Sequence, residues 1–141
     1  MSISKASASW SGGFKDGKGT MKGAHAPEAA FSAGTRFEGQ PGSNPEELIG
    51  AALAGCYSMA LTLGLEKAGL KPTSVSSTAD VTLERLESGF TITGIALVTK
   101  AVVPGADEAK FQEIAEATKK GCPVSKVLAA TKISLTATVS A

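Results

Sequence analysis

Hydrophobic and polar residues alternate in short runs along the first part of the chain, and each run predicts a half-exposed β-strand. Residues 6–10 and 18–21 alternate on either side of Asp16-Gly17, a dipeptide typical of hairpin turns. We therefore predict a first hairpin. Residues 24–32 contain Ala and Pro and are expected to form a connector, and residues 35–38 alternate and predict a short third strand.

A long apolar segment follows and predicts a helix over residues 44–68. Asn44 or Ser43 is suited to the N-cap, Pro45 to the first helical position, and the two glutamates after it to the positive end of the helix dipole. Gly69 is expected to end the helix. Residues 48–65 carry no charge, so the helix either spans a membrane or is buried in a core. Its many Ala, Gly, Ser and Thr residues favour a buried central helix.

The second half of the chain predicts another hairpin, two helices and a last strand. Residues 75–86 and 90–103 are two long alternating runs joined by a turn with Gly. Residues 107–120 have apolar positions at helical spacing, an acidic start and a basic end, and a short helix over 123–130 follows. Hydrophobic and polar residues alternate again over residues 133–139, which predicts the last strand. Strands that come in hairpins indicate an α+β fold with a mainly antiparallel sheet.

Length and composition fit one domain over residues 1–141. We divide it into an N-terminal hairpin and strand (1–40), the central helix (44–68) and a C-terminal part (75–141). The chain has a formal net charge of +1 and 19% charged residues, which argues against a nucleic-acid protein with a basic face.

The glycine-rich segment at residues 12–19 has the spacing of a phosphate-binding loop. That loop needs a buried strand before it and a helix after it, whose amides hold the phosphate. The residues after Gly19 include Gly and Pro and are not expected to start a helix. The hairpin is therefore the better interpretation of this segment.

The N-terminus has no apolar stretch, so we expect no secretory signal and a cytoplasmic protein. Two cysteines, far apart in the chain, are too few for a disulfide framework. A single histidine, His25, excludes a histidine-rich metal site.

Cys56 and Cys122 are the candidate reactive groups. Cys56 lies within the apolar helix, where a buried and inert thiol is one interpretation. Cys122 follows Lys119 and Lys120 and precedes a helix, and both features lower a thiol pKa. Local chemistry alone therefore nominates Cys122 as the reactive thiol.

Longer patterns surround both cysteines and an upstream arginine. They are Thr35-Arg-Phe-Glu-Gly39, Asn44-Pro-Glu-Glu-Leu-Ile-Gly-Ala-Ala52, Ala54-Gly-Cys-Tyr-Ser-Met-Ala-Leu61 and Gly121-Cys-Pro-Val-Ser-Lys126. In this order they resemble the osmotically inducible protein C (OsmC) branch of the OsmC/Ohr hydroperoxide reductase family. The resemblance covers nearly the whole chain, and the two cysteine patterns at this separation are highly specific.

The resemblance implies a thiol peroxidase that acts in oxidative and osmotic stress defence. Cys56 would attack the peroxide and become a sulfenic acid, and Cys122 would condense with it to a disulfide. Arg36 would stabilise the Cys56 thiolate, and Glu47 would hold the Arg36 guanidinium through a charge-assisted pair. An apolar pocket around Cys56 would admit alkyl tails, and Cys122 would be the accessible resolving partner.

The resemblance also implies the partners of the protein: an organic hydroperoxide as substrate, an external dithiol of lipoyl type as reductant, and a second copy in an intertwined homodimer around the long helix. It implies no metal and no bound cofactor, and from the charge balance and the helix composition given above we expect neither a nucleic acid nor a membrane as a partner. Two alternatives from other classes are a non-catalytic redox sensor or binding protein that uses the same pocket, and a structural dimer with two inert thiols.

Helix geometry raises a question about which chain supplies Glu47. Glu47 and Cys56 are nine positions apart on the expected helix, which places their side chains on roughly opposite faces and about 13.5 Å apart along the axis. Either the partner subunit supplies Glu47 and Arg36, or a kink at Gly50 or Gly55, or the long Arg36 side chain, keeps the site within one chain.

Overall fold

The computed structural model describes all residues, 1–141, and has the predicted α+β composition with two three-stranded sheets. By internal contacts the chain divides into two compact units, Met1–Leu48 and Ile49–Ala141. Each unit is described by itself below. The prediction of one domain over the whole chain stays a prediction.

The first unit contains an antiparallel sheet of β1 (Ala6–Ser11), β2 (Lys18–Gly23) and β3 (Ala29–Phe31), in that order. The predicted first hairpin is confirmed, with Ser11 paired to Lys18 at its end. Residues 12–17 form its connection, in which Gly12 has a φ of 92° and the Gly17 amide donates to the Gly13 carbonyl at 2.8 Å. A strand follows the glycine-rich segment, so its spacing serves a hairpin and not a phosphate-binding loop.

The predicted strand at residues 35–38 is wrong. The chain forms β3 within the expected connector and then a short helix, α1 (Ala33–Phe37). The reason is a capping box: the Thr35 amide donates to Ser32 Oγ at 3.2 Å, and the Ser32 amide donates to Thr35 Oγ1 at 2.9 Å. These reciprocal bonds hold the first turn of a helix, and they outweigh the weak alternation of four residues.

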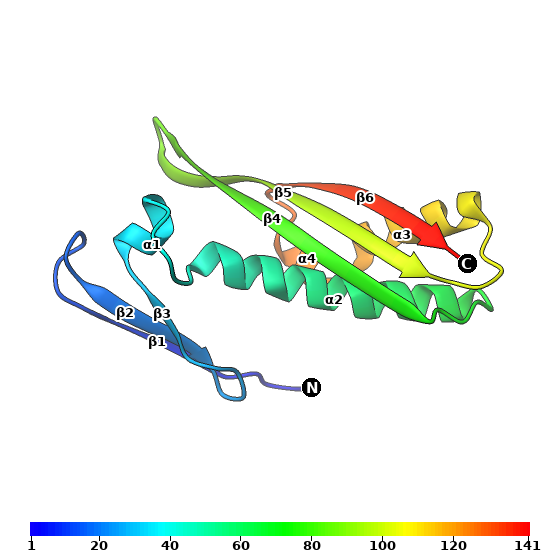
Figure 1. Cartoon of the computed structure of the whole chain (residues 1–141), viewed down its shortest axis with the longest axis horizontal. Helices are drawn as coiled ribbons and strands as arrows, with labels where there is room; N and C mark the ends of the chain where they lie inside the picture. The colour runs from blue at the N-terminus through cyan, green and yellow to red at the C-terminus, as the bar shows by residue number, and fades with distance from the viewer. The chain divides into compact units, whose positions relative to one another are not determined.

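In the second unit, β4 (Ser74–Leu86) and β5 (Gly89–Val102) form the predicted long antiparallel hairpin, and β6 (Lys132–Ser140) pairs with β5. The β5–β6 pair is parallel, so the sheet is mixed. Two helices, α3 (Glu108–Gly121) and α4 (Pro123–Val127), make the crossover that a parallel pair requires. Figure 1 shows these helices together with α2 on one face of the sheet.

The long helix α2 (Pro45–Lys67) matches its predicted bounds closely. Asn44 is its N-cap residue, since its Oδ1 accepts from the Glu47 amide at 2.8 Å, and Gly69 follows its end with a φ of 81°. Four side chains spaced four residues apart are 0% exposed and form the centre of the core with the sheet and α3: Leu53, Tyr57, Leu61 and Leu65. The Tyr57 hydroxyl donates to the Ala115 carbonyl at 3.0 Å and ties α2 to α3.

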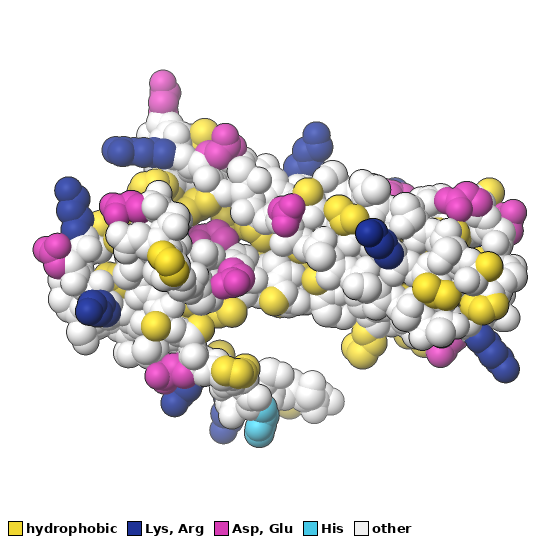
Figure 2. Space-filling model, in the orientation of Figure 1, with side chains coloured by type: hydrophobic (Ala, Val, Ile, Leu, Met, Phe, Trp, Pro, Cys, Tyr) yellow, Lys and Arg dark blue, Asp and Glu magenta, His cyan; other side chains and the backbone are white.

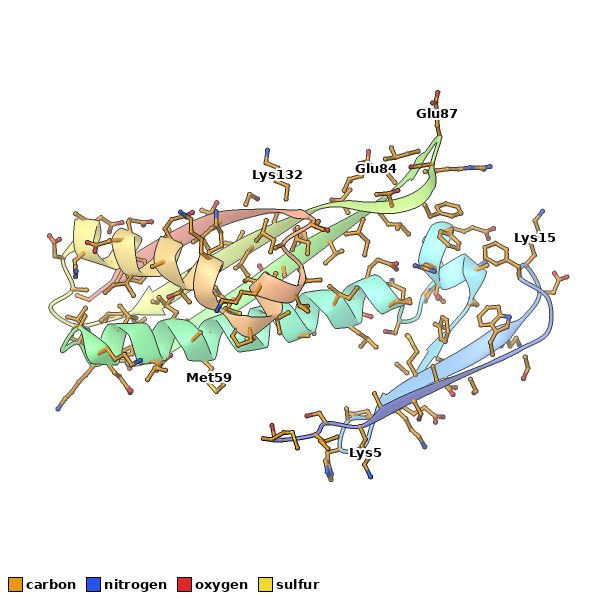
Figure 3. All side chains as sticks on the ribbon, turned by 180° about the vertical axis from the view of Figure 1, so that it is seen from behind. Lys5, Lys15, Met59, Glu84, Glu87 and Lys132 are labelled. Carbon is orange, nitrogen blue, oxygen red and sulfur yellow. The ribbon has the colours of Figure 1, made fainter.

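The opposite face of α2 is apolar and open in the single chain, so the prediction of a buried central helix holds for one side only. Met59 is 74% exposed and Leu63 is 51% exposed. Figure 3 shows Met59 pointing from α2 away from the β4–β5–β6 sheet. The helix is long and apolar enough to cross a membrane, with a mean hydropathy of 1.7, but its other face carries the core of the second unit.

Charged side chains are spread over the surface. In the face drawn in Figure 2, Lys and Arg side chains are interspersed with Asp and Glu. This mixture agrees with the formal net charge of +1.

Truncation of the buried side of α2 tests this core. Leu61→Ala should lower the free energy of unfolding by about 2–5 kcal/mol, because it removes a fully buried side chain and leaves a cavity. Val127→Ala, at a position 81% exposed, should change it by less than about 0.5 kcal/mol. Urea unfolding followed by circular dichroism measures both. Equal losses for the two variants would show that α2 does not pack as described.

Candidate functional site

The two cysteines meet in the second unit although 66 positions separate them in the chain. Cys56 lies on α2, and Cys122 lies at the junction of α3 and α4. Both thiols are free, and their sulfur atoms are 3.0 Å apart and share a hydrogen bond. The core of α2, α3 and the sheet fixes both helices, so packing holds the two sulfurs together.

Cys122 has two roles in the backbone at once. It is the C-cap of α3, where its amide donates to the Thr118 carbonyl at 2.9 Å, and it is also the N-cap of α4. Pro123 follows at the first position of α4, where its missing N–H is no loss. The extended backbone of Cys122 turns the chain sharply between the helices and directs the sulfur towards α2.

The two thiols differ in exposure. Cys122 is 1% exposed, whereas Cys56 is partly exposed. The expectation that Cys122 is the accessible partner is therefore wrong for the single chain.

The two thiols also differ in acidity. Burial raises the pKa of Cys56, and the hydrogen bond with Cys122 raises it further. Burial opposes ionisation of Cys122 as well, but hydrogen bonding to the ionised sulfur by Cys56, by the amide and hydroxyl of Ser125 and by the Val124 amide outweighs it, and the pKa of Cys122 is lowered. The lowered pKa of Cys122 agrees with the prediction from local chemistry.

The cause differs from the predicted one. Lys119 Nζ lies 2.8 Å from Glu116 Oε1, so this ammonium is paired along the surface of α3. The donors that lower the pKa of Cys122 are instead groups at the start of α4. No cation is among the groups that shift the pKa of Cys56.

Arg36 and its carboxylate partner lie in the first unit. Arg36 Nη2 is 2.6 Å from Glu46 Oε1, and Arg36 Nε donates to the same oxygen at 2.9 Å. The Glu46 side chain is only 8% exposed, and that of Arg36 is 34% exposed. The guanidinium also lies over the Phe37 ring, with Cζ 5.2 Å from its centroid. These contacts hold the Arg36 head group in one orientation.

The prediction that Glu47 pairs with Arg36 is therefore wrong within the chain. Glu47 occupies the third position of α2, where its amide binds Asn44 and its carboxylate accepts a hydrogen bond from Ser43 Oγ at 2.7 Å. These contacts engage Glu47 in the start of the helix. Its neighbour Glu46 faces Arg36 instead.

An apolar pocket of 330 Å³ lies beside Arg36 in the first unit. Paired aromatic rings form much of its wall, with Trp10 and Phe31 centroids 5.3 Å apart and those of Phe14 and Phe37 5.9 Å apart. In the second unit, a groove of 440 Å³ between α2 and α3 reaches Cys122 and Pro123. Cys56 lines neither of these two hollows, and the predicted apolar pocket around Cys56 stays a prediction.

Sequence reasoning missed two residues of these clusters. The capping pattern was the signal for Glu46. With Asn44 as the N-cap, Glu47 takes the third helical position and is engaged by the cap, so Glu46 is the glutamate that can pair with Arg36. Ser125 is buried beside Cys122, and its spacing of three residues from a helix N-cap was the available signal. No group of three or more His, Cys, Asp or Glu side chains is arranged to hold a metal ion.

Comparison with known proteins identifies relatives over most of the chain. A family model described as OsmC-like protein matches residues 37–137. The chain is 50% identical over 128 residues to peroxiredoxin OsmC of Escherichia coli (strain K12), covering 89% of this chain and 90% of that protein. It is 33% identical over 88 residues to an organic hydroperoxide resistance protein of Xanthomonas axonopodis pv. citri (strain 306), covering 62% and 60%.

Solved structures of the same kind share its fold. An OsmC-like protein of unknown function from Vibrio cholerae has a TM-score of 0.77 at 18% identity, covering 98% of this chain and 100% of that one. The organic hydroperoxide resistance protein OhrB of Bacillus subtilis has a TM-score of 0.67 at 23% identity, covering 96% and 98%.

Two neighbouring glutamates provide a matched test of the ion pair. Glu46→Gln should lower the free energy of unfolding of the first unit by about 1–2 kcal/mol, because it weakens a charge-assisted bidentate pair at a buried carboxylate. Glu47→Gln removes the same charge one position away and should cost less than about 0.5 kcal/mol. Thermal unfolding at low and high salt measures both. A larger loss for Glu47→Gln would contradict the pairing described here.

Proposed function

This chain belongs to the OsmC-like protein family and is a peroxidase, and we propose that it reduces organic hydroperoxides to alcohols through Cys56 and Cys122. The Cys56 thiolate attacks the outer peroxide oxygen, the O–O bond breaks, and the alkoxide leaves as the alcohol after taking up a proton. Cys56 is then a sulfenic acid. The Cys122 sulfur attacks the Cys56 sulfur, water leaves, and a disulfide forms. An external dithiol returns both cysteines to thiols and is itself oxidised to a disulfide.

The observation that carries this proposal is the 3.0 Å contact between the two sulfurs. At this distance a sulfenic acid on Cys56 needs only a small movement to bond with Cys122. Both thiols are held by packed helices, so the condensation does not require a disordered loop to find its partner. A structural pair of inert thiols has no need of such an approach.

Exposure supports Cys56 as the first nucleophile. Its sulfur is the more accessible of the two, and peroxide must reach the sulfur that it oxidises. The raised pKa of Cys56 is the obstacle, because only the thiolate attacks. A fixed cation removes this obstacle, and Arg36 is a permanent cation that Glu46 and Phe37 hold in place.

We assign this cation to the partner subunit of a homodimer. Glu46 lies ten positions before Cys56 on α2, and the rise of about 15 Å along the axis keeps the two side chains of one straight helix from meeting at one site. The open apolar face of α2, with Met59 and Leu63, is suited to burial against a second copy. Arg36 and Glu46 of one subunit then act on Cys56 of the other.

The aromatic pocket beside Arg36 supports an organic hydroperoxide as the substrate. Its walls offer apolar surface to an alkyl or aryl group, which hydrogen peroxide lacks. The proposal includes a lipoyl-type dithiol as the reductant and a cytoplasmic location, and it needs no metal and no bound cofactor. A redox sensor would use the same sulfur pair without turnover, so multiple turnovers distinguish the two functions.

Single-cysteine variants test the roles of the two thiols. Cys122→Ser should consume one equivalent of cumene hydroperoxide and stop at a sulfenic acid on Cys56, whereas Cys56→Ser should react at least about 100-fold more slowly. The wild type should form a Cys56–Cys122 disulfide within one chain and turn over many equivalents with a dithiol. Stopped-flow kinetics and peptide mass spectrometry measure these outcomes.

Three results would contradict this assignment. Fast reaction of Cys56→Ser but not of Cys122→Ser would reverse the roles. Disulfides found only between chains would exclude the condensation described above. One equivalent consumed by the wild type, with no turnover when a dithiol is present, would indicate a sensor.

Subunit exchange tests the shared site. Mixing Cys56→Ser with Glu46→Ala, each inactive alone, should restore activity in heterodimers, since one of their two sites is then wild type in both residues. Glu47→Ala in place of Glu46→Ala serves as the control and should be active before mixing. If exchange is confirmed by native mass spectrometry and activity does not return, each chain builds its own site.

A further inference from the structure

Ser125 is the one buried side chain whose polar atom has no regular hydrogen-bond partner. It lies in α4 and is 4% exposed, and its hydroxyl makes no bond of normal geometry with any protein group. A buried hydroxyl without a partner is unfavourable, so its presence calls for an explanation. The same hydroxyl is among the groups that lower the pKa of Cys122, the N-cap residue three positions earlier.

The chain contains a reference for this geometry. At the start of α1, Ser32 and Thr35 occupy the N-cap and the third helical position and are joined by three hydrogen bonds. In one of them the amide of the N-cap residue donates to the hydroxyl at the third position, and in another that hydroxyl donates to the N-cap carbonyl at 3.1 Å. A hydroxyl at this position therefore has a standard partner, the N-cap amide.

Cys122 and Ser125 have the same spacing at the start of α4, but that partner is missing. The Cys122 amide is already used as the C-cap of α3, where it donates to the Thr118 carbonyl. The Ser125 hydroxyl therefore does not accept a hydrogen bond from its N-cap amide, as the Thr35 hydroxyl does. It faces the sulfur of the N-cap residue together with the amides of Val124 and Ser125, which lower the pKa of that thiol.

We propose that Ser125 is a positioning residue that donates a hydrogen bond to the Cys122 thiolate and so makes Cys122 the leaving group when the Cys56–Cys122 disulfide is reduced. This inference rests on the proposed function. It adds which sulfur the external dithiol attacks and which sulfur leaves when the disulfide is reduced. The hydroxyl lacks a partner while both thiols are protonated, and it gains one when Cys122 carries charge. Exposure gives the same direction, since Cys56 is the more exposed of the two residues.

The step balances as two thiol–disulfide exchanges. A thiolate of the external dithiol attacks the Cys56 sulfur, the Cys56–Cys122 bond breaks, and its electron pair goes to Cys122, where Ser125 and the α4 amides hold the charge. The second thiol of the reductant loses its proton and attacks the reductant's other sulfur, which is bonded to Cys56 in the mixed disulfide. Cys56 leaves as a thiolate, the reductant becomes a disulfide, and the protons released by the dithiol return the two cysteines to the resting state.

The test compares Ser125→Ala with Ser125→Thr, which keeps a hydroxyl. In a Cys56→Ser background, ultraviolet titration of the thiolate should give a higher pKa for Cys122 with Ser125→Ala, and Ser125→Thr should return it towards the parent value. In the two-cysteine protein, oxidised with diamide so that no peroxidase activity is needed, reduction by dithiothreitol at neutral pH should be roughly threefold to tenfold slower for Ser125→Ala. An unchanged titration would overturn the proposal.

A matched control separates this effect from general loss of a hydroxyl. Ser58→Ala removes a partly buried hydroxyl on α2 that is bonded to Ser77, and it should leave the titration of Cys122 unchanged. An equal shift in Ser58→Ala would mean that the effect is structural and would refute the role of Ser125.

The wild-type protein gives a second measurement that requires no variant. Diamide-oxidised protein treated with excess 2-mercaptoethanol and quenched with acid should carry the mixed disulfide on Cys56. An adduct on Cys122 would overturn the direction of reduction. Because diamide prepares the disulfide, failure to react with hydroperoxides would count against the proposed function alone.

Discussion

The contact between the Cys56 and Cys122 sulfurs depends on the packing of α2 against α3. One thiol lies within a long helix and the other lies between two helices, so neither can move far without disturbing the core. The Tyr57 hydroxyl, next to Cys56 in sequence, bonds the Ala115 carbonyl of α3 and fixes the two helices in register. The sulfur pair is therefore held by the same buried residues that stabilise the second unit, and a mutation that loosens this core also separates the sulfurs.

Acidity and accessibility are divided between the two thiols. The buried sulfur, Cys122, has the lowered pKa, and the partly exposed sulfur, Cys56, has the raised one. If only the groups around the two thiols in this chain set their pKa values, the more buried sulfur, Cys122, would therefore ionise first. This mismatch is the physical argument for a cation brought from elsewhere, because a guanidinium beside Cys56 favours the charge on the accessible sulfur. It also explains why local chemistry and the family resemblance nominated different nucleophiles.

Much of the fold could be predicted because its long elements carry strong periodic patterns. The bounds of α2 follow from Asn44, Pro45 and Gly69, and the β4–β5 hairpin follows from two long alternating runs. The errors occur where few residues decide the outcome. The turn at Ser32 forms a capping box that overrides a four-residue alternation, and the parallel pairing of β6 depends on tertiary contacts that alternation does not encode. At the candidate site, the sequence pattern nominated both cysteines and Arg36, whose roles stay predictions. The two adjacent glutamates could be told apart only through the helix cap, which engages Glu47.

The double role of residue 122 links backbone structure to redox chemistry. A residue that ends one helix and begins the next gives its amide to the first and presents its side chain to the amides of the second. With a serine or an aspartate at this position, the side chain would be an ordinary cap. With cysteine, on the proposed mechanism, the same donors face a sulfur that gains charge only during the reaction, so they stabilise the thiolate more than the thiol. The cost is a weaker cap in the resting state and a buried hydroxyl without a partner at Ser125. The proposed charged state offsets this cost, and on that mechanism the start of α4 belongs to the reactive site as well as to the scaffold.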